Sequence, residues 1–261
     1  MIYTMQYTSV MLEIINHGSV REIRLARPPV NALNPELVNL LTLSLHEATP
    51  DCDAIVLSGR DGMFSAGLDV VDLIQLNRSG ITEFWSNFFE LLQTVASSPV
   101  PVAAAITGHS PAGGAVVCLM CDYRVMSRGD YRIGLNETRV GLVIPPLLHN
   151  AMARLVGPRV AEHMLVAGTL IDPENALKAG LVDALETGYS DTLEHAVRWC
   201  EKLLSLPQQS MLGNRAVARA HFDHAFSAYT SEGVASFVDT WFSDETQNVL
   251  KSMVDQLKDK K

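Results

Sequence analysis

The sequence FSAGLD at residues 64–69 decides the fold, because it lies just beyond a short apolar segment, DAIVLS at residues 53–58. The same arrangement recurs where PVPVAAAI at residues 99–106 runs into TGHSPAGG at residues 107–114. Short apolar runs bounded by turn residues predict buried strands. Helical sequence follows each turn, so these are strand-to-helix corners, where ligands of open α/β sheets usually bind. We expect an α/β fold whose ligand site lies at the two corners.

The rest of the chain supplies further strands and many helix starts. A side-chain cap followed by proline and an acid predicts helices beginning at Asn34 and at Asp172. From Asp172 onward the sequence becomes helical, the last helix opens at Ser243, and we place a soft boundary near residue 195. Short strands are expected at residues 9–15, 20–25, 123–126 and 131–133.

The composition argues against several classes of protein. The 261-residue chain has a net charge of −9 and no basic stripe, which disfavours nucleic-acid binding. An anionic ligand remains compatible with this charge, because helix N-termini hold phosphates. Apolar stretches are too short or too interrupted to span a membrane. The scattered cysteines do not form a disulfide framework, and we interpret Cys118 and Cys121 as buried helix thiols rather than metal ligands.

The N-terminal sequence has no cationic segment ahead of an apolar one, so no signal or transit peptide is visible. We therefore expect a soluble protein of a reducing compartment, cytoplasmic and bacterial-like. A processed form from the mitochondrial matrix is the alternative.

The second corner permits two chemical interpretations. The sequence GHSPA at residues 108–112 resembles the GxSxG elbow of serine hydrolases, with Ser110 as nucleophile and downstream acids and histidines as partners. The elbow's oxyanion hole needs the N–H of the residue after the serine, and Pro111 has none. In the other interpretation, Gly113 donates its N–H to a carbonyl oxygen from the start of a helix, together with an N–H from the first corner.

A third segment, IGLNET at residues 133–138, carries an acid in a partly apolar stretch. Burial would raise the pKa of Glu137 and make it a general base. A surface or capping role is the alternative for a single glutamate in a loop.

Taken together, five motifs resemble those of the crotonase superfamily, also called the enoyl-CoA hydratase/isomerase family. They cover residues 20–188, and their order and spacing are specific although each motif is weak alone. The motifs are RPPVNAL, FSAGLD, TGHSPAGG through CDYRV, IGLNETRVGL and AGTLIDPENALKAGLVD. The sequences SAGLD, PAGG, CDYR and IGLNET most resemble those of the mitochondrial-type Δ3,Δ2-enoyl-CoA isomerase branch.

The resemblance implies a role for particular residues. The two oxyanion-hole donors correspond to the N–H groups of Leu68 and Gly113. Hydratases carry one glutamate where Val116 stands and a second at Glu137, and they have proline where Asn136 stands. Without the first carboxylate efficient hydration is not expected, whereas isomerisation needs only one base, Glu137. Ala66, Gly67, Asp69 and Asn136 are implied to contact the substrate.

The resemblance also implies an architecture: a spiral of ββα units at residues 1–195, forming the acyl-CoA-binding core, and a helical region at residues 196–261 that assembles trimers or hexamers. The preferred function is a Δ3,Δ2-enoyl-CoA isomerase of fatty acid β-oxidation. The substrate is an acyl-CoA thioester, and no metal or separate cofactor is required. The alternatives are another crotonase reaction (hydratase, thioester hydrolase or lyase) and a serine esterase built on Ser110.

Overall fold

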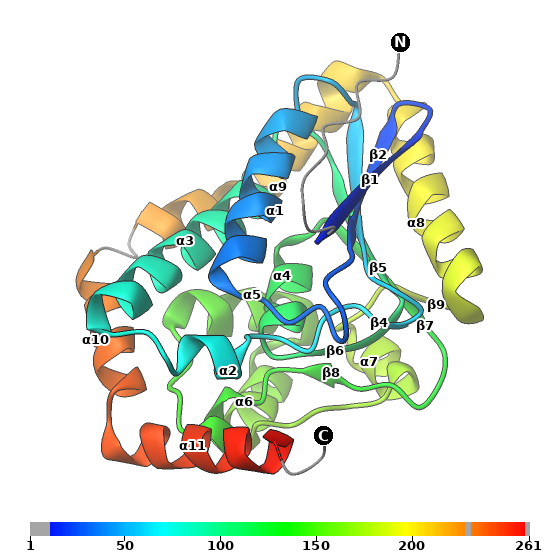
Figure 1. The fold of residues 1–261 in the computed structure, drawn as a ribbon. Helices are drawn as coiled ribbons and strands as arrows, with labels where there is room; N and C mark the ends of the chain where they lie inside the picture. The colour runs from blue at the N-terminus through cyan, green and yellow to red at the C-terminus, as the bar shows by residue number, and fades with distance from the viewer. Residues whose placement is uncertain (1–10, 228–230, 259–261) are drawn as a thin grey trace.

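Two sheets organise the protein, whose computed structural model describes residues 11–227 and 231–258 (Figure 1). The six-stranded sheet has the order β1-β2-β3-β5-β7-β9, antiparallel between β1 and β2 and parallel elsewhere. The second sheet has the order β4-β6-β8 and is parallel. The strands are β1 Leu12–His17, β2 Val20–Leu25, β3 Ala54–Ser58, β4 Gly62–Met63, β5 Val102–Ile106, β6 Gly108–Pro111, β7 Tyr123–Ser127, β8 Ile133–Gly134 and β9 Ala184–Glu186.

The chain winds through repeated ββα units. In each of the pairs β3/β4, β5/β6 and β7/β8, the first strand joins the large sheet and the second joins the small one. A helix follows each pair. The helices are α1 Pro35–Ala48, α2 Val70–Leu73, α3 Arg78–Ala96, α4 Gly113–Met120, the 3-10 helix η1 Glu137–Val140, α5 Pro146–Val156, α6 Pro158–Ala167, α7 Pro173–Ala179, α8 Gly188–Leu204, α9 Gln208–Ser227, α10 Ser231–Trp241 and α11 Asp244–Lys258.

The predicted helix starts are confirmed. The side chain of Asn34 accepts a hydrogen bond from the Leu37 N–H, and Asp172 accepts one from the Asn175 N–H. Ser243 directly precedes α11 and accepts from the Thr246 N–H. Each cap satisfies a donor that the first helical turn leaves without an intrahelical partner. Residues 9–10 of the predicted first strand, and residues 259–261, lie outside the described residues.

Alternate residues of the large sheet face two different cores. On one face Ala54, Val56, Ala103 and Ala105 pack against α8. On the other face the neighbouring residues contact α1, α3 and α4 in the larger core (Figure 1). The boundary expected near residue 195 falls inside α8, which covers the sheet, so α8 belongs structurally to the sheet-containing part.

The aromatic side chains of α3 are buried in the larger core. Trp85 is buried and packs edge-on against Phe237 and Trp241 of α10.

No helix in the described ranges is long and apolar enough to cross a membrane.

Candidate functional site

The first corner directs the backbone N–H of Leu68 away from its strand neighbour. Leu33 and Leu68 form a parallel bridge in which the Leu33 N–H donates to the Gly67 carbonyl and the Leu33 carbonyl accepts from Asp69. A residue bridged in this way turns its own N–H to the opposite side. Within the described residues, the Leu68 N–H donates no hydrogen bond.

The second corner places Gly113 at the first position of α4, where its N–H has no intrahelical acceptor. Ala112 precedes it with φ 48° and ψ −125°, a conformation that L-residues rarely adopt. Its N–H donates to the Gly134 carbonyl over 2.8 Å, and its carbonyl accepts from Val116, so the strained turn is held at both ends.

The two corners touch through their glycines. A Cβ atom added to Gly67 would lie 2.9 Å from the Ala112 Cβ and 3.2 Å from the Gly113 nitrogen. A Cβ added to Gly113 would lie 3.5 Å from the Leu68 nitrogen. Two backbone donors, one at a helix N-terminus, are thus adjacent and have no acceptor in the described part of the chain. Such an arrangement stabilises a developing oxyanion.

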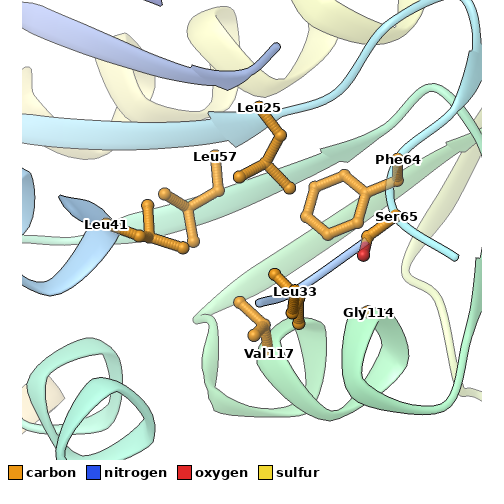
Figure 2. A pocket seen from close by; sticks show the side chains of 8 residues that line it. All are labelled: Leu25, Leu33, Leu41, Leu57, Phe64, Ser65, Gly114 and Val117. Atoms are coloured by element: carbon orange, nitrogen blue, oxygen red, sulfur yellow. The ribbon is translucent and has the colours of Figure 1, made fainter. Parts of the chain in front are cut away.

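The wall behind the donors is apolar and closely packed. Leu33 and Leu68 each place a methyl carbon 3.2 Å from the position of a Gly113 Cβ. Behind Leu33 lies a small apolar cavity, with space of about 10 Å³ for a water-sized sphere (Figure 2). That is room for about one water, and its apolar lining disfavours even this. The cavity is a packing gap and cannot hold an acyl chain.

Asp69 fixes the first corner from the protein side. Its carboxylate lies 2.7 Å from the Arg27 guanidinium and accepts the Asp72 N–H as the cap of α2. Arg27 also donates to the Ala32 carbonyl, which ties the corner to the loop that carries Leu33. Asp69, predicted to contact substrate, is therefore engaged with protein partners in this structure. Arg27 is likewise paired rather than a free surface cation.

Further contacts that the sequence did not reveal brace the same corner. The Ser65 hydroxyl donates to the Asn31 carbonyl over 2.7 Å and accepts the Gly67 N–H. Asn31 has a φ of 51° and donates its amide to the Phe64 carbonyl. The Ala66 N–H donates to Val30. No local pattern marks these pairs, because they join segments more than thirty residues apart.

Glu137 begins η1 with its side chain almost enclosed, at 9% exposure. Burial raises the pKa of this carboxyl to about 7. Within the described part of the chain its Oε2 has no hydrogen-bond partner. A buried carboxyl that titrates near neutral pH and has a free oxygen is suited to accept and return a proton.

Asn136 adds a second unsatisfied oxygen next to Glu137. Its Oδ1 is buried and has no partner among the described residues, whereas its carbonyl accepts the Arg139 N–H. Buried polar atoms are rarely left unpaired, and an unpaired oxygen beside Glu137 is available to a bound group.

The small sheet connects the second corner to Glu137. Pro111 of β6 pairs with Gly134 of β8, three residues before Glu137, and the Ala112 N–H bonds to the Gly134 carbonyl. The sheet thus joins the segments that carry Gly113 and Glu137. The sequence predicted both residues but not the sheet that links them, whose strands are only two to four residues long.

Ser110 lacks the surroundings of a nucleophile. It is fully buried in β6, and the polar atom near its hydroxyl is the Cys118 Sγ, at 3.9 Å. The elbow motif needs its nucleophile on the strained turn, and that position belongs to Ala112. In the described structure no histidine bonds to Ser110; His195 pairs with Glu186 and Tyr123, and His109 accepts from the Arg132 N–H.

Comparisons with known proteins agree with this geometry. The family model described as Enoyl-CoA hydratase/isomerase matches residues 16–260. Enoyl-CoA delta isomerase 1, mitochondrial, of Mus musculus is 33% identical over 260 residues, covering 97% of this chain and 88% of that protein. The crystal structure of human mitochondrial delta3-delta2-enoyl-CoA isomerase matches with a TM-score of 0.91 at 28% identity, over 96% of this chain and 99% of that one.

An enoyl-CoA hydratase from Bacillus halodurans shares the fold at a TM-score of 0.84 and 18% identity, over 93% of this chain and 99% of that one. The expected crotonase fold and helical C-terminal region are therefore confirmed. Proteins named as isomerases and as hydratases both share this architecture, so the reaction has to be argued from the residues of the site.

Proposed function

The chain belongs to the enoyl-CoA hydratase/isomerase family, and we propose that it is a Δ3,Δ2-enoyl-CoA isomerase acting on unsaturated fatty acyl-CoA. The mouse and human relatives are named for this reaction. The residues at the two corners and in η1 support the same assignment.

In the proposed reaction the thioester oxygen accepts hydrogen bonds from the N–H groups of Leu68 and Gly113. The Glu137 carboxylate removes a proton from C2, the C–H electron pair moves into the thioester, and a dienolate forms. The neutral Glu137 carboxyl then returns the proton to C4, and the double bond moves from C3–C4 to C2–C3. The step is redox-neutral and restores Glu137, so it requires only the groups of this chain.

The observation that carries the proposal is the buried carboxyl of Glu137, one oxygen of which has no hydrogen-bond partner among the described residues. Glu137 has a free oxygen and a pKa of about 7, which lets it act as base and then as acid at neutral pH. Val116, the position at which the resemblance implies a hydratase's other glutamate, is a buried apolar residue in α4. A second acid to activate water is thus missing from that position. Asn136, with its unpaired oxygen, is proposed to help place the substrate.

The alternative is another reaction of the same family. Hydration, thioester hydrolysis and carbon–carbon cleavage all use an oxyanion hole, and they differ in the group that activates water or the leaving carbon. They require a second positioned acid or base beside Glu137.

Assembly into a trimer or hexamer is part of the proposal. The outer surfaces of the C-terminal half carry exposed valines, with Val166 72% and Val217 79% accessible in the single chain. A neighbouring subunit that covered these side chains would remove their apolar surface from water. Sedimentation equilibrium on the purified protein measures the state directly, and a monomer at micromolar concentration contradicts this part.

The test of function is conversion of 3-enoyl-CoA to the conjugated 2-enoyl-CoA, followed by absorbance. In Glu137→Gln we expect kcat to fall about 10³-fold or more, because one group performs both proton transfers. Glu83→Gln makes the same change on the exposed face of α3 and should leave kcat unchanged. Absence of product with the wild-type protein, or full activity in Glu137→Gln, overturns the proposal. Parallel assay of 2-enoyl-CoA hydration identifies the alternative.

A further inference from the structure

The C-terminal helix α11 contacts both halves of the candidate site. It packs against α2, which begins just after Leu68 and Asp69, and against η1, which begins at Glu137 (Figure 1). The last helix of the chain therefore bridges the carbonyl donors and the proposed base, although more than a hundred residues separate it from Glu137.

One side chain of α11 makes the polar contact with the base loop. Thr246 is fully buried, and its hydroxyl donates to the Gly141 carbonyl over 2.7 Å. The same oxygen accepts from the Ser243 hydroxyl over 3.0 Å. Because Ser243 supplies the donor to Thr246, the single hydroxyl proton of Thr246 is committed to the loop.

The loop is shaped to meet this threonine. Gly141 ends η1 in the left-handed conformation, with φ 77°. A Cβ on Gly141 would lie 3.0 Å from the Thr246 Oγ1 and 3.1 Å from its Cα, so only glycine permits this approach. The next residue, Leu142, donates its N–H to the Glu137 carbonyl over 3.0 Å. This hydrogen bond joins the end of the loop to the backbone of the proposed base.

The other side of the loop is held by α6. The Thr138 hydroxyl donates to the Leu165 carbonyl over 2.7 Å. A Cβ on Gly168 would lie 2.9 Å from the Arg139 Cγ, which shows how closely this helix end approaches η1. The loop is thus held between α6 and α11, while Glu137 Oε2 and Asn136 Oδ1 have no hydrogen-bond partner among the described residues.

We propose that Thr246 is a positioning residue: its hydrogen bond to Gly141 lets the C-terminal helix fix the direction of the Glu137 carboxylate. The proposal rests on the proposed function for the task of Glu137. The hydrogen bond between Thr246 and Gly141, which we call the tether, concerns the position of the loop and can be tested without the reaction. A base that transfers a proton between two carbons has to stay within reach of both, and misplacement by about 1 Å costs on the order of 10²-fold in rate.

The test compares three variants in the full-length protein. Thr246→Val keeps the shape and removes the hydroxyl; we expect kcat to fall about tenfold with KM changed less than about twofold, since the substrate-binding surface is intact. Thr246→Ser keeps the hydroxyl and should restore kcat. Val254→Ala loosens the buried face of α11 without touching the loop, and should lower thermal stability but leave kcat near wild type.

A readout without substrate separates this inference from the proposed function. In Thr246→Val we expect faster amide hydrogen exchange across residues 137–142, including the Leu142 amide, and wild-type exchange in Thr246→Ser. If the wild type has no isomerase activity, the proposed function fails and the exchange data alone decide on the tether. Unchanged exchange and kcat in Thr246→Val, or equal loss of kcat in Val254→Ala, overturn the inference. Thr246→Ala replaces the valine variant if that variant does not fold.

Discussion

The donor corners and the base loop are built on opposite principles. At the corners, glycine lets the two segments approach closely: a Cβ on Gly67 would lie 2.9 Å from the Ala112 Cβ and 3.1 Å from the Pro111 carbonyl oxygen. In the base loop, side chains hold the backbone, through Thr138 on one side and Thr246 on the other. The corner contact depends on the absence of a side chain at Gly67, whereas the two side-chain hydrogen bonds that join the loop to α6 and α11 depend on one hydroxyl each.

This difference matches what each part has to do. An oxyanion hole stabilises charge best when its donors are already oriented and need no reorganisation. A carboxyl that carries a proton between two carbons needs burial to raise its pKa and a free oxygen to receive the proton. At Glu137 both are present. The comparison predicts that crowding the corners is more damaging than perturbing the loop.

Among the variants that leave Glu137 in place, the largest effect on kcat is expected from Gly67→Ala. Its Cβ would lie 2.9 Å from the Ala112 Cβ and 3.2 Å from the Gly113 nitrogen, which forces the corners apart. Loss of one oxyanion donor costs about 10²–10³ in kcat, and we expect an effect of that size. Steady-state kinetics with 3-enoyl-CoA measures it.

Gly62→Ala is the matched control for this variant. Gly62 has a φ of 79°, similar to the 86° of Gly67, but a Cβ there meets nothing within 4 Å. Both variants carry the backbone strain of about 1 kcal/mol that alanine suffers at positive φ. Only Gly67→Ala should lose activity. Equal activities in the two variants show that the corners are not the oxyanion hole.

Glu137 in the base loop should make the free energy of unfolding depend on pH. The pKa of Glu137 rises from its usual 4.5 to about 7 in the folded protein, so between these values the folded state binds more protons than the unfolded state. The free energy of unfolding therefore falls as pH rises through this window. Glu137→Gln has no such titrating group. From pH 5 to pH 8, its free energy of unfolding should therefore rise by about 2 kcal/mol relative to that of the wild type.

Urea unfolding of the two proteins at each pH measures this difference. The internal reference is acid pH, well below 4.5, where the Glu137 carboxyl is protonated in both the folded and the unfolded state and the difference between the proteins no longer changes. A difference that stays constant from pH 5 to 8 shows that Glu137 is not a buried proton carrier.

Local signals made much of the fold predictable. The caps at Asn34 and Asp172 bond to N–H groups three residues away, so their sequence neighbours suffice. The buried strands of the large sheet show as apolar runs for the same reason. Of the small sheet, the sequence predicts only a strand at residues 131–133, which overlaps β8 at Ile133; β4 and β6 are too short to show any alternation. The sequence therefore names Gly113 and Glu137 but not the strand pairing that joins their segments.

The contacts that hold the site are invisible in the sequence for a different reason. Thr246 and Gly141 are 105 residues apart, and neither stands in a pattern that distinguishes it from an ordinary helix or turn residue. Asp69 shows the same limit: the sequence places it at the corner, but not the contacts of its carboxylate with Arg27 and with the start of α2. A sequence predicts residue types at corners, and only packing decides which way each side chain turns.

The smallest effect is expected from Ser110→Ala, at the residue where the sequence left two chemistries open. The Ser110 hydroxyl is buried in β6 beside Cys118, and Ala112 holds the strained position that an elbow nucleophile requires. Ser110→Ala should keep kcat within about twofold and change stability by about 1 kcal/mol or less, the value of one weak hydrogen bond. The same 3-enoyl-CoA assay, run beside ester hydrolysis, makes the measurement. Loss of activity in this variant would mean that the second corner works through a side chain, whereas retained activity leaves the Gly113 backbone as its working group.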